Sequence, residues 1–169
     1  MRRQESSAVS RRGAAHGFTI VELVITVAII ALLATAVVPS AQLVFQRERE
    51  AELKVALRAI RTAIDEYKRA SDSGRIKKDA DRTGYPPDLQ TLVDGVDDAK
   101  SPKDGAKIYF LRAVPRDPFW PDATVPAAET WGLRSYASPP DDPQPGDDVY
   151  DVYSRSSRTG LNGVPYRDW

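Results

Sequence analysis

One long apolar run constrains this chain more than any other feature. From Phe18 to Phe45 the only ionisable side chain is that of Glu22, and residues 23–38 are almost wholly apolar. A run of more than about 18 such residues is long enough to cross the hydrocarbon core of a bilayer, about 30 Å thick. Backbone groups in lipid must pair within their own segment. The run therefore predicts a membrane-spanning helix at residues 18–45.

The character of the sequence changes at Gln46, but the helical pattern continues. Apolar residues recur at spacings of four and three, which places them on one face of a helix. They are Leu53, Leu57, Ile60, Ile64 and Tyr67. No Gly or Pro interrupts residues 40–70, so we predict one helix from Phe18 to about Ala70, roughly 80 Å long, with residues 46–70 as its amphipathic half. Pro39 removes one helical hydrogen bond, so a kink or a local melt is expected there.

Residues 71–169 have a different amino-acid composition, which is typical of a small β-rich head. They hold 12 of the 13 prolines and 8 of the 10 glycines. Residues 108–111, 133–136 and 149–154 are short runs rich in β-prone side chains, and residues 88–93 suggest a helical turn capped by Asp88. We expect an α+β fold, in which the long helix buries its apolar stripe against a small antiparallel sheet.

Composition narrows the classes of function. The net charge is zero, so nothing argues for a nucleic-acid partner. There is no cysteine, and the only histidine is His16. If residues 1–17 are a removed leader, the remaining chain has no Ser–His–Asp or Cys–His nucleophile and no His/Cys zinc site. No phosphate-binding glycine loop is present either. Chemistry by carboxylate, Tyr or Lys side chains stays open, but the commonest catalytic groups are absent, so we expect a chain that is not an enzyme.

A basic leader precedes the apolar run. Residues 1–17 carry four arginines and one glutamate, a balance of 4 − 1 = +3, which leaves 20 basic and 23 acidic residues, or −3, in the remainder. Export machinery reads a basic segment before an apolar one and keeps the basic end in the cytoplasm. At the boundary stands Gly-Phe-Thr-Ile-Val-Glu at residues 17–22.

These features resemble the class III signal of type IV pilins and type II secretion pseudopilins. The resemblance implies cleavage by prepilin peptidase between Gly17 and Phe18, N-methylation of Phe18, and a role for Glu22 in setting the register of filament assembly. Pro39 stands near a helix position where the family often carries proline.

The chemistry of Glu22 supports the same role. A carboxylate within a membrane costs about 2.5–3.5 kcal/mol on insertion scales, so a sequence that keeps one there is expected to pair it. After cleavage the nearest cation is the α-amino group of Phe18, ideally in a neighbouring copy, and a copy out of register would leave both charges unpaired. The simpler interpretation is that Glu22 reaches the membrane interface and favours the helix N-terminus.

A rival interpretation of the segment is an ordinary secretory signal. Ala34-Thr35-Ala36 has the A-x-A form of a signal-peptidase site, and cleavage there would release a soluble protein that starts near Val37. Glu22 inside the apolar region and a helix pattern that continues through the site argue against it.

The head also resembles the family, and the major pseudopilin of type II secretion in particular. The similar segments are Gly-Tyr-Pro-Pro-Asp-Leu-Gln-Thr-Leu at 84–92, Val-Pro-Arg-Asp-Pro at 114–118 and Asp-Val-Tyr-Ser at 151–154. In the major pseudopilins the last segment leads into a calcium-binding loop. Here Ser and Arg, including Arg155 and Arg158, replace its acidic residues and oppose a cation. Calcium requires six to eight oxygen ligands, and the candidate ligands are Asp147, Asp148, Asn162 and Asp168. The alternative is that Tyr166 and Trp169 pack the C-terminus onto the sheet.

The resemblance implies a filament subunit with four regions: a leader at 1–17, a transmembrane and assembly helix at 18–45, its amphipathic half at 46–70, and a head at 71–169. We expect a single-pass protein of the bacterial inner membrane, with a cytoplasmic N-terminus and a periplasmic head. Its partners would be copies of itself, prepilin peptidase, the assembly platform and minor pseudopilins. A type II secretion pseudopilus is favoured, and a type IV surface pilus for adhesion, motility or DNA uptake is the alternative. A signal-anchored periplasmic enzyme is the third and least favoured hypothesis.

Overall fold

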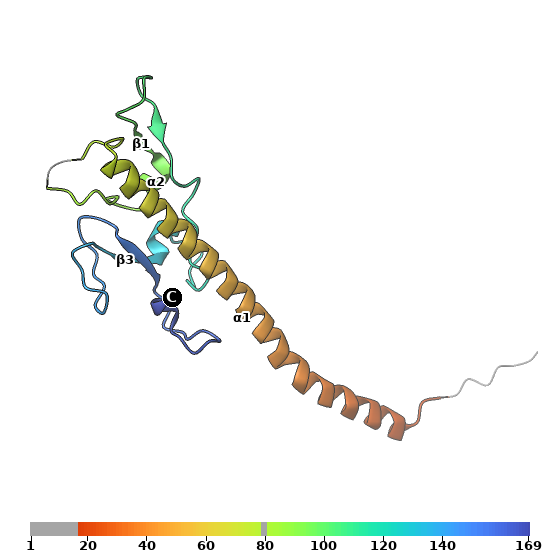
Figure 1. Cartoon of the computed structure of the whole chain (residues 1–169). Coiled ribbons are helices and arrows are strands. Elements are labelled where there is room, and N and C mark those ends of the chain that lie inside the picture. Colours follow the sequence, from red (N-terminus) through yellow and green to blue (C-terminus); the bar gives the residue numbers. More distant parts are fainter. Residues whose placement is uncertain (1–16, 79–80) are drawn as a thin grey trace, which may run out of the picture. The chain divides into compact units, whose positions relative to one another are not determined.

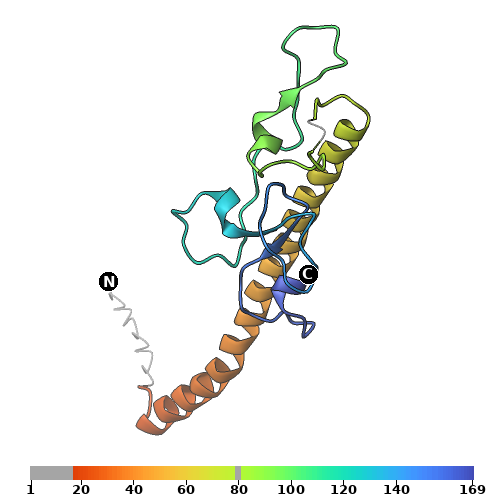
Figure 2. The same ribbon diagram turned by 90° about the vertical axis from the view of Figure 1, so that its left-hand side faces the viewer.

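The structure, a computed structural model, describes residues 17–78 and 81–169, and among them the side chains of 35–41 are left aside. The chain divides into two compact units, Met1–Gln42 and Leu43–Trp169. The elements in chain order, shown in Figures 1 and 2, are α1 (Ile20–Asp72), α2 (Thr91–Asp94), β1 (Val96–Asp97), β2 (Lys107–Ile108), η1 (Ala127–Thr130), β3 (Trp131–Arg134), β4 (Asp151–Ser154) and η2 (Tyr166–Asp168), where η marks a 3-10 helix.

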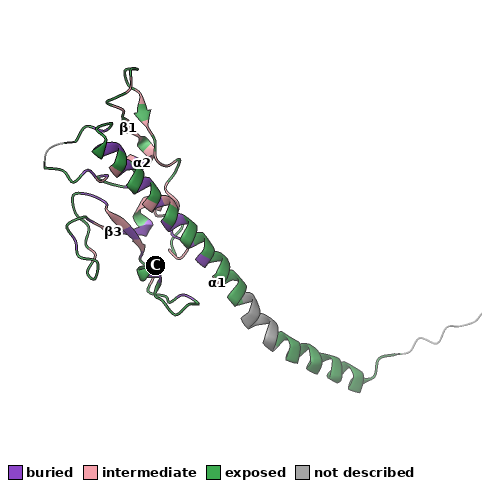
Figure 3. Cartoon of the chain, in the orientation of Figure 1, coloured by how far each residue is buried: buried purple, intermediate pink, exposed green. Residues whose placement is uncertain are grey.

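The described part of the first unit is the beginning of α1. Its large apolar side chains from Phe18 to Leu33 are all exposed, as Figure 3 shows by its unbroken green in this segment. Among the residues described here, no helix is long and apolar enough to cross a membrane, so the membrane-spanning segment at residues 18–45 stays a prediction from the sequence. Helix α1 is continuous through Pro39, and the local melt considered there is wrong.

In the second unit, α1 buries one face in the core, as its sequence predicts. All five residues of the predicted stripe are buried, and three alanines of the same helix are buried with them: Leu53, Leu57, Ile60, Ile64 and Tyr67, with Ala56, Ala63 and Ala70. They pack against apolar side chains of the following segments, including Leu92, Trp131, Val152 and Tyr166. Neither surface could be hidden alone, which is why a helix and a small β region share one core.

Within the described residues, the β structure consists of two separate antiparallel ladders and one isolated bridge between Thr159 and Pro165. Strand β1 pairs with β2, with Val96 opposite Ile108, and β3 pairs with β4, with Trp131 opposite Ser154. The α+β class is therefore confirmed, but the expectation of a single sheet is wrong. Residues 107–108 pair with a strand of two residues, which is too short for sequence periodicity to reveal.

The β3–β4 ladder requires a glycine on β3. Gly132 lies opposite Tyr153, and an added Cβ at Gly132 would lie 2.3 Å from the tyrosine ring. The ring therefore occupies the space that any larger residue would need. This close approach fixes how Tyr153 lies across the strand pair.

The ends of the two helices follow local sequence signals. Helix α1 ends before Gly74, whose φ of 71° closes the last turn, and the N–H of Arg75 donates to the carbonyl of Ala70. Helix α2 is shorter than the predicted turn at 88–93 and its N-cap position is Gln90, but Oδ1 of Asp88 still accepts the N–H of Thr91, the first helical residue, at 2.7 Å. Capping of this kind satisfies a helix donor that otherwise has no partner.

Candidate functional site

The predicted cleavage point lies in accessible chain without regular secondary structure, just before α1. Gly17 and Phe18 precede the helix and are exposed, and the Phe18 side chain is 80% exposed. Thr19 caps α1: its hydroxyl accepts the N–H of Glu22 at 3.2 Å, and its carbonyl accepts that of Leu23 at 3.1 Å. A threonine cap followed three residues later by glutamate is a recognised helix-start pattern. The sequence therefore offered a start signal at Thr19 that the expected start at Phe18 overlooked.

Glu22 lies in the first turn of α1 and is exposed. Among the residues described, its carboxylate forms no hydrogen bond or ion pair. Its place at the helix N-terminus is electrostatically favourable, which both interpretations of this residue allow. Pro39 lies on the same helix, among the residues whose side chains are left aside. The assembly roles of Phe18, Glu22 and Pro39 stay predictions.

The three head segments singled out in the sequence meet in space. The buried Asp117 of the 114–118 segment accepts the hydroxyl of Ser154, at the end of β4, at 2.6 Å. The Val149 N–H, just before β4, donates to the carbonyl of Pro86 at 2.8 Å. Trp131 of β3 donates its indole N–H to the carbonyl of Pro115, also at 2.8 Å. These residues therefore hold the head together around β4.

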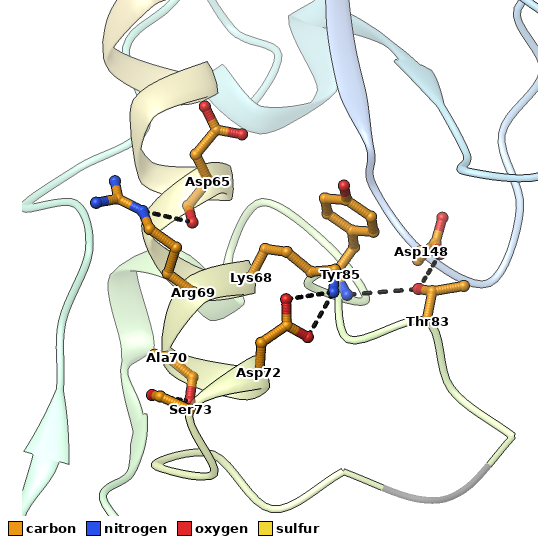
Figure 4. Close-up of polar contacts among 9 residues, drawn as sticks. All are labelled: Asp65, Lys68, Arg69, Ala70, Asp72, Ser73, Thr83, Tyr85 and Asp148. Carbon is orange, nitrogen blue, oxygen red and sulfur yellow. Dashed lines mark hydrogen bonds and ion pairs between the residues drawn. The ribbon is translucent and has the colours of Figure 1, made fainter.

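Near the C-terminal end of α1, the 83–85 segment is fastened by polar contacts (Figure 4). The Thr83 hydroxyl donates to Oδ2 of Asp148, whose Oδ1 accepts the N–H of Tyr136 at 2.8 Å. Lys68 pairs with Asp72 at 2.5 Å, and its Nζ lies 5.5 Å from the ring centroid of Tyr85. Asp148 is buried, and its two oxygens serve to connect loops.

A carboxylate that the sequence analysis did not single out anchors the C-terminal loop. Glu50 is 8% exposed, and its Oε1 accepts hydrogen bonds from Gln46 Nε2 at 3.1 Å, the N–H of Leu161 at 2.8 Å and the hydroxyl of Tyr166 at 2.9 Å. Burial raises the pKa of Glu50, but the donors outweigh it, and the result is a pKa below the ordinary value. Donors that favour the charged form account for this direction.

Aromatic packing completes this anchor. The Tyr166 ring is fully buried and stacks on Phe119 with 4.0 Å between centroids, while Trp169 meets it edge-on at 5.1 Å. Lys54 of α1 lies 4.5 Å from the ring centroid of Trp169. The alternative proposed for the C-terminus, in which Tyr166 and Trp169 pack it down, is confirmed. The contact reaches α1 as well as the β region.

The four calcium candidates do not come together. Asp147 and Asp148 line a pocket of about 760 Å³ with Thr83, and both oxygens of Asp148 already accept hydrogen bonds. Asn162 and Asp168 line a different pocket, of about 500 Å³, where Lys54, Arg58 and Arg61 add positive charge. In the described part of the chain, no group of three or more His, Cys, Asp or Glu side chains is placed to hold a metal ion. These residues therefore do not fit one calcium site.

The arginines of the C-terminal loop lie against aromatic rings instead. The guanidinium carbon of Arg155 lies 4.9 Å from the ring centroid of Trp120, and that of Arg158 lies 5.3 Å from that of Phe119. Contacts of this kind attract a cation to the face of a ring. In the loop that follows β4, this chain places side-chain cations and the contacts of the Glu50 anchor.

Comparison with known proteins finds one match. Residues 12–38 match the family model described as the prokaryotic N-terminal methylation motif. The match includes Gly17, Phe18 and Glu22 and stops just before Pro39, and its first five residues lie outside the part of the chain that the structure describes. No curated protein and no solved structure matches the chain. The chain thus carries an N-terminal methylation motif, which supports a type IV pilin-like protein.

Proposed function

We propose that the chain is the structural subunit of a filament polymerised from the bacterial inner membrane, and specifically of a type II secretion pseudopilus. The observation that carries the proposal is the methylation motif at residues 12–38, set on an exposed Gly17–Phe18 bond at the start of an apolar helix. Prepilin peptidase would cut this bond, and Phe18 would then be N-methylated.

The apolar part of α1 would anchor the subunit and later form the filament core. Its side chains from Phe18 to Leu33 are exposed, and a helix that is apolar on every side needs lipid or other protein around it. In the membrane it would be surrounded by lipid, and in the filament by the same helix of other copies. Glu22 would pair with the α-amino group of Phe18 in an adjacent copy and so fix the register.

Two observations favour the pseudopilus over a long surface fibre. The chain has no cysteine, whereas many surface pilins close their C-terminal region with a disulfide. The head segments that resemble the major pseudopilin are joined through the contacts of Asp117 with Ser154 and of Val149 with Pro86. On this proposal the head stays periplasmic, and the filament moves other proteins outward.

Mass spectrometry of the chain extracted from membranes tests the processing. We expect a protein that begins at Phe18 and carries one added methyl group. A chain that starts near Val37 would instead indicate an ordinary secretory signal. Deletion of the gene then separates the two kinds of filament: loss of proteins from the culture medium indicates the pseudopilus, and loss of surface fibres with normal secretion indicates a pilus.

A further inference from the structure

The solvent face of α1 in the second unit carries a row of positive charge. Arg47, Lys54 and Arg58, here called the basic stripe, are separated by seven and four residues and so share one face of the helix. All three are exposed. Arg61 continues the row but is already paired with Asp151 at 2.7 Å. The stripe extends about 16 Å along the helix.

In the described part of the chain the charges of the stripe are only partly balanced: Lys54 interacts electrostatically with Glu50, and Asp168 lines a pocket with Lys54 and Arg58. Within residues 17–78 and 81–169, no acidic side chain forms an ion pair with Arg47, Lys54 or Arg58. Lys54 lies over the Trp169 ring, and the Nε of Arg58 donates to the carbonyl of Lys54. The stripe therefore presents a positive surface to whatever lies beside the head.

The loop between β3 and β4, blue in Figure 1, carries the opposite charge. From residue 135 to 150 the chain has four aspartates and no basic residue. Asp148 is buried and hydrogen-bonded, but the other three are exposed. Asp141, Asp142 and Asp147, here called the acidic loop, form no ion pair with any described residue, although Asp141 lines a pocket with Arg61, Arg134 and Arg167 of its own copy. Asp142 accepts the side-chain N–H of Gln144.

The acidic loop is held in one shape before any partner arrives. Its prolines at 139, 140, 143 and 145 each fix one backbone angle. The Ser138 hydroxyl donates to the carbonyl of Asp142 at 3.1 Å and accepts the N–H of Gln144 at 2.8 Å, and the carbonyl of Gln144 accepts the N–H of Ser135 at 2.9 Å. Because a preorganised loop loses little entropy on binding, the acidic loop is suited to present its charges to a partner.

We infer that the basic stripe of one copy receives the acidic loop of a second copy. This contact rests on the proposed filament function and names one lateral contact within it. It joins two different surfaces, so every copy offers one of each, and such a head-to-tail contact builds an open filament wherever its rotation does not close a ring. Complementary charges of this kind fix register and exclude wrong arrangements more than they add affinity.

A membrane surface is the competing partner for the stripe. Anionic lipid attracts basic residues only within about a Debye length, roughly 8 Å at physiological salt. Arg58 lies about 16 Å along the helix from Arg47. A membrane surface beside one end of the stripe would therefore be too far from the other end to attract its charge. A loop from a neighbouring copy can follow the whole stripe.

Cysteine cross-linking of the full chain tests the contact, because the chain has no cysteine of its own. Arg58→Cys and Asp141→Cys, combined in one chain and treated with a short bis-maleimide in assembled filaments, should give a ladder of dimers, trimers and larger species. Cells that make the two single-cysteine chains together should give dimers only. Lys103→Cys with Asp141→Cys is the matched control and should give no ladder, since Lys103 is exposed but lies outside the stripe.

A second measurement keeps the inference testable if the cysteine chains assemble poorly. Arg58→Glu and Asp141→Lys should each lower the yield of pelleted filaments roughly tenfold or more, because like charges then face each other. The two changes together should restore the yield, and Lys103→Glu should leave it unchanged.

The outcomes separate this inference from the proposed function. Filaments at normal yield with no ladder, or without rescue by the double charge reversal, would overturn the contact and leave the filament function standing. An effect of Arg58→Glu but none of Asp141→Lys, together with weaker binding of the full chain to phosphatidylglycerol vesicles, would assign the stripe to lipid and overturn the inference. Absence of any filament from the unaltered chain would overturn the proposed function itself.

Discussion

Helix α1 carries two carboxylates whose surroundings are opposite. Glu50 is buried, and three donors from three different parts of the chain converge on its Oε1. Glu22 is exposed, and among the described residues its carboxylate has no partner. One chain therefore supplies Glu50 with three hydrogen-bond donors, whereas the described residues supply the Glu22 carboxylate with none. The comparison teaches that the later part of α1 packs into the core of a compact unit. The early part, which is exposed, is suited to contacts with other molecules.

The largest expected effect is at the unsatisfied carboxylate. Glu22→Ala should leave a stable subunit in the membrane but abolish detectable filaments, because the α-amino group of a neighbouring Phe18 loses its counter-charge. Electron microscopy of sheared cells and immunoblots of membrane fractions measure the two quantities. Glu48→Ala, an exposed acid on the same helix, is the control and should assemble normally. Normal filaments from the Glu22 variant would show that its carboxylate does not set the register.

Among the contacts of Glu50, the Tyr166 ring should contribute most to the free energy of unfolding. Tyr166→Ala removes a fully buried ring and a donor to Glu50, and it should lower the free energy of unfolding by about 3–5 kcal/mol. Chemical denaturation of the detergent-solubilised full chain measures this. Tyr109→Ala should change it by less than about 0.5 kcal/mol, because Tyr109 is 64% exposed. Equal effects of the two variants would mean that the C-terminus is not packed as described.

A smaller loss in the free energy of unfolding is expected when Glu50 is replaced by glutamine, which has nearly the same shape but no charge. Glu50→Gln weakens the hydrogen bonds from Leu161 and Tyr166, and should cost about 1–2 kcal/mol in the free energy of unfolding. Glu52→Gln, at an exposed position on α1, should cost less than about 0.5 kcal/mol. A neutral result for the Glu50 variant would contradict the anchor.

The pH dependence of stability should follow from the same group. Because the pKa of Glu50 is lower in the folded chain than its ordinary value of 4.5, the unfolded state binds more protons between the two values. Its contribution is therefore fully present above pH 4.5 and is lost as the pH falls through the folded pKa. Melting temperatures of the unaltered chain should fall more steeply in this range than those of Glu50→Gln. Parallel curves would exclude this role for Glu50.

The smallest effect is expected at a surface ion pair. Arg75 and Asp98 meet at 2.5 Å, which holds the pKa of the Asp98 carboxyl below its ordinary value. Such exposed pairs contribute little because water and salt screen them. Arg75→Gln should leave the melting temperature unchanged within error. A clear drop would show that this contact, rather than the Glu50 anchor, secures the end of the head.

Local periodicity revealed the helix and its core face, but not the contacts that join distant segments. The stripe from Leu53 to Tyr67 was predictable because its spacing alone places it on one face. Glu50 was overlooked because it stands in a charged run, and its partners Leu161 and Tyr166 are more than a hundred residues away. Its position three residues before Leu53, in line with the apolar stripe, was the one available signal.

The β region shows the same limit. Residues 133–136 were expected as a strand, but β3 is Trp131–Arg134. Gly132 is a weak strand former, and its place in the ladder depends on the Tyr153 ring across from it. Strand β1 has two residues, which is too few for an alternation of apolar and polar side chains to predict it from the sequence. Pairing across long separations decides such elements.

The most direct test of the central claim is a high-resolution structure of the assembled filament. We predict that the carboxylate of Glu22 lies within about 4 Å of the α-amino nitrogen of Phe18 in a neighbouring copy, the distance expected of an ion pair. A filament in which this carboxylate faces apolar surroundings, with no amine close to it, would contradict the account.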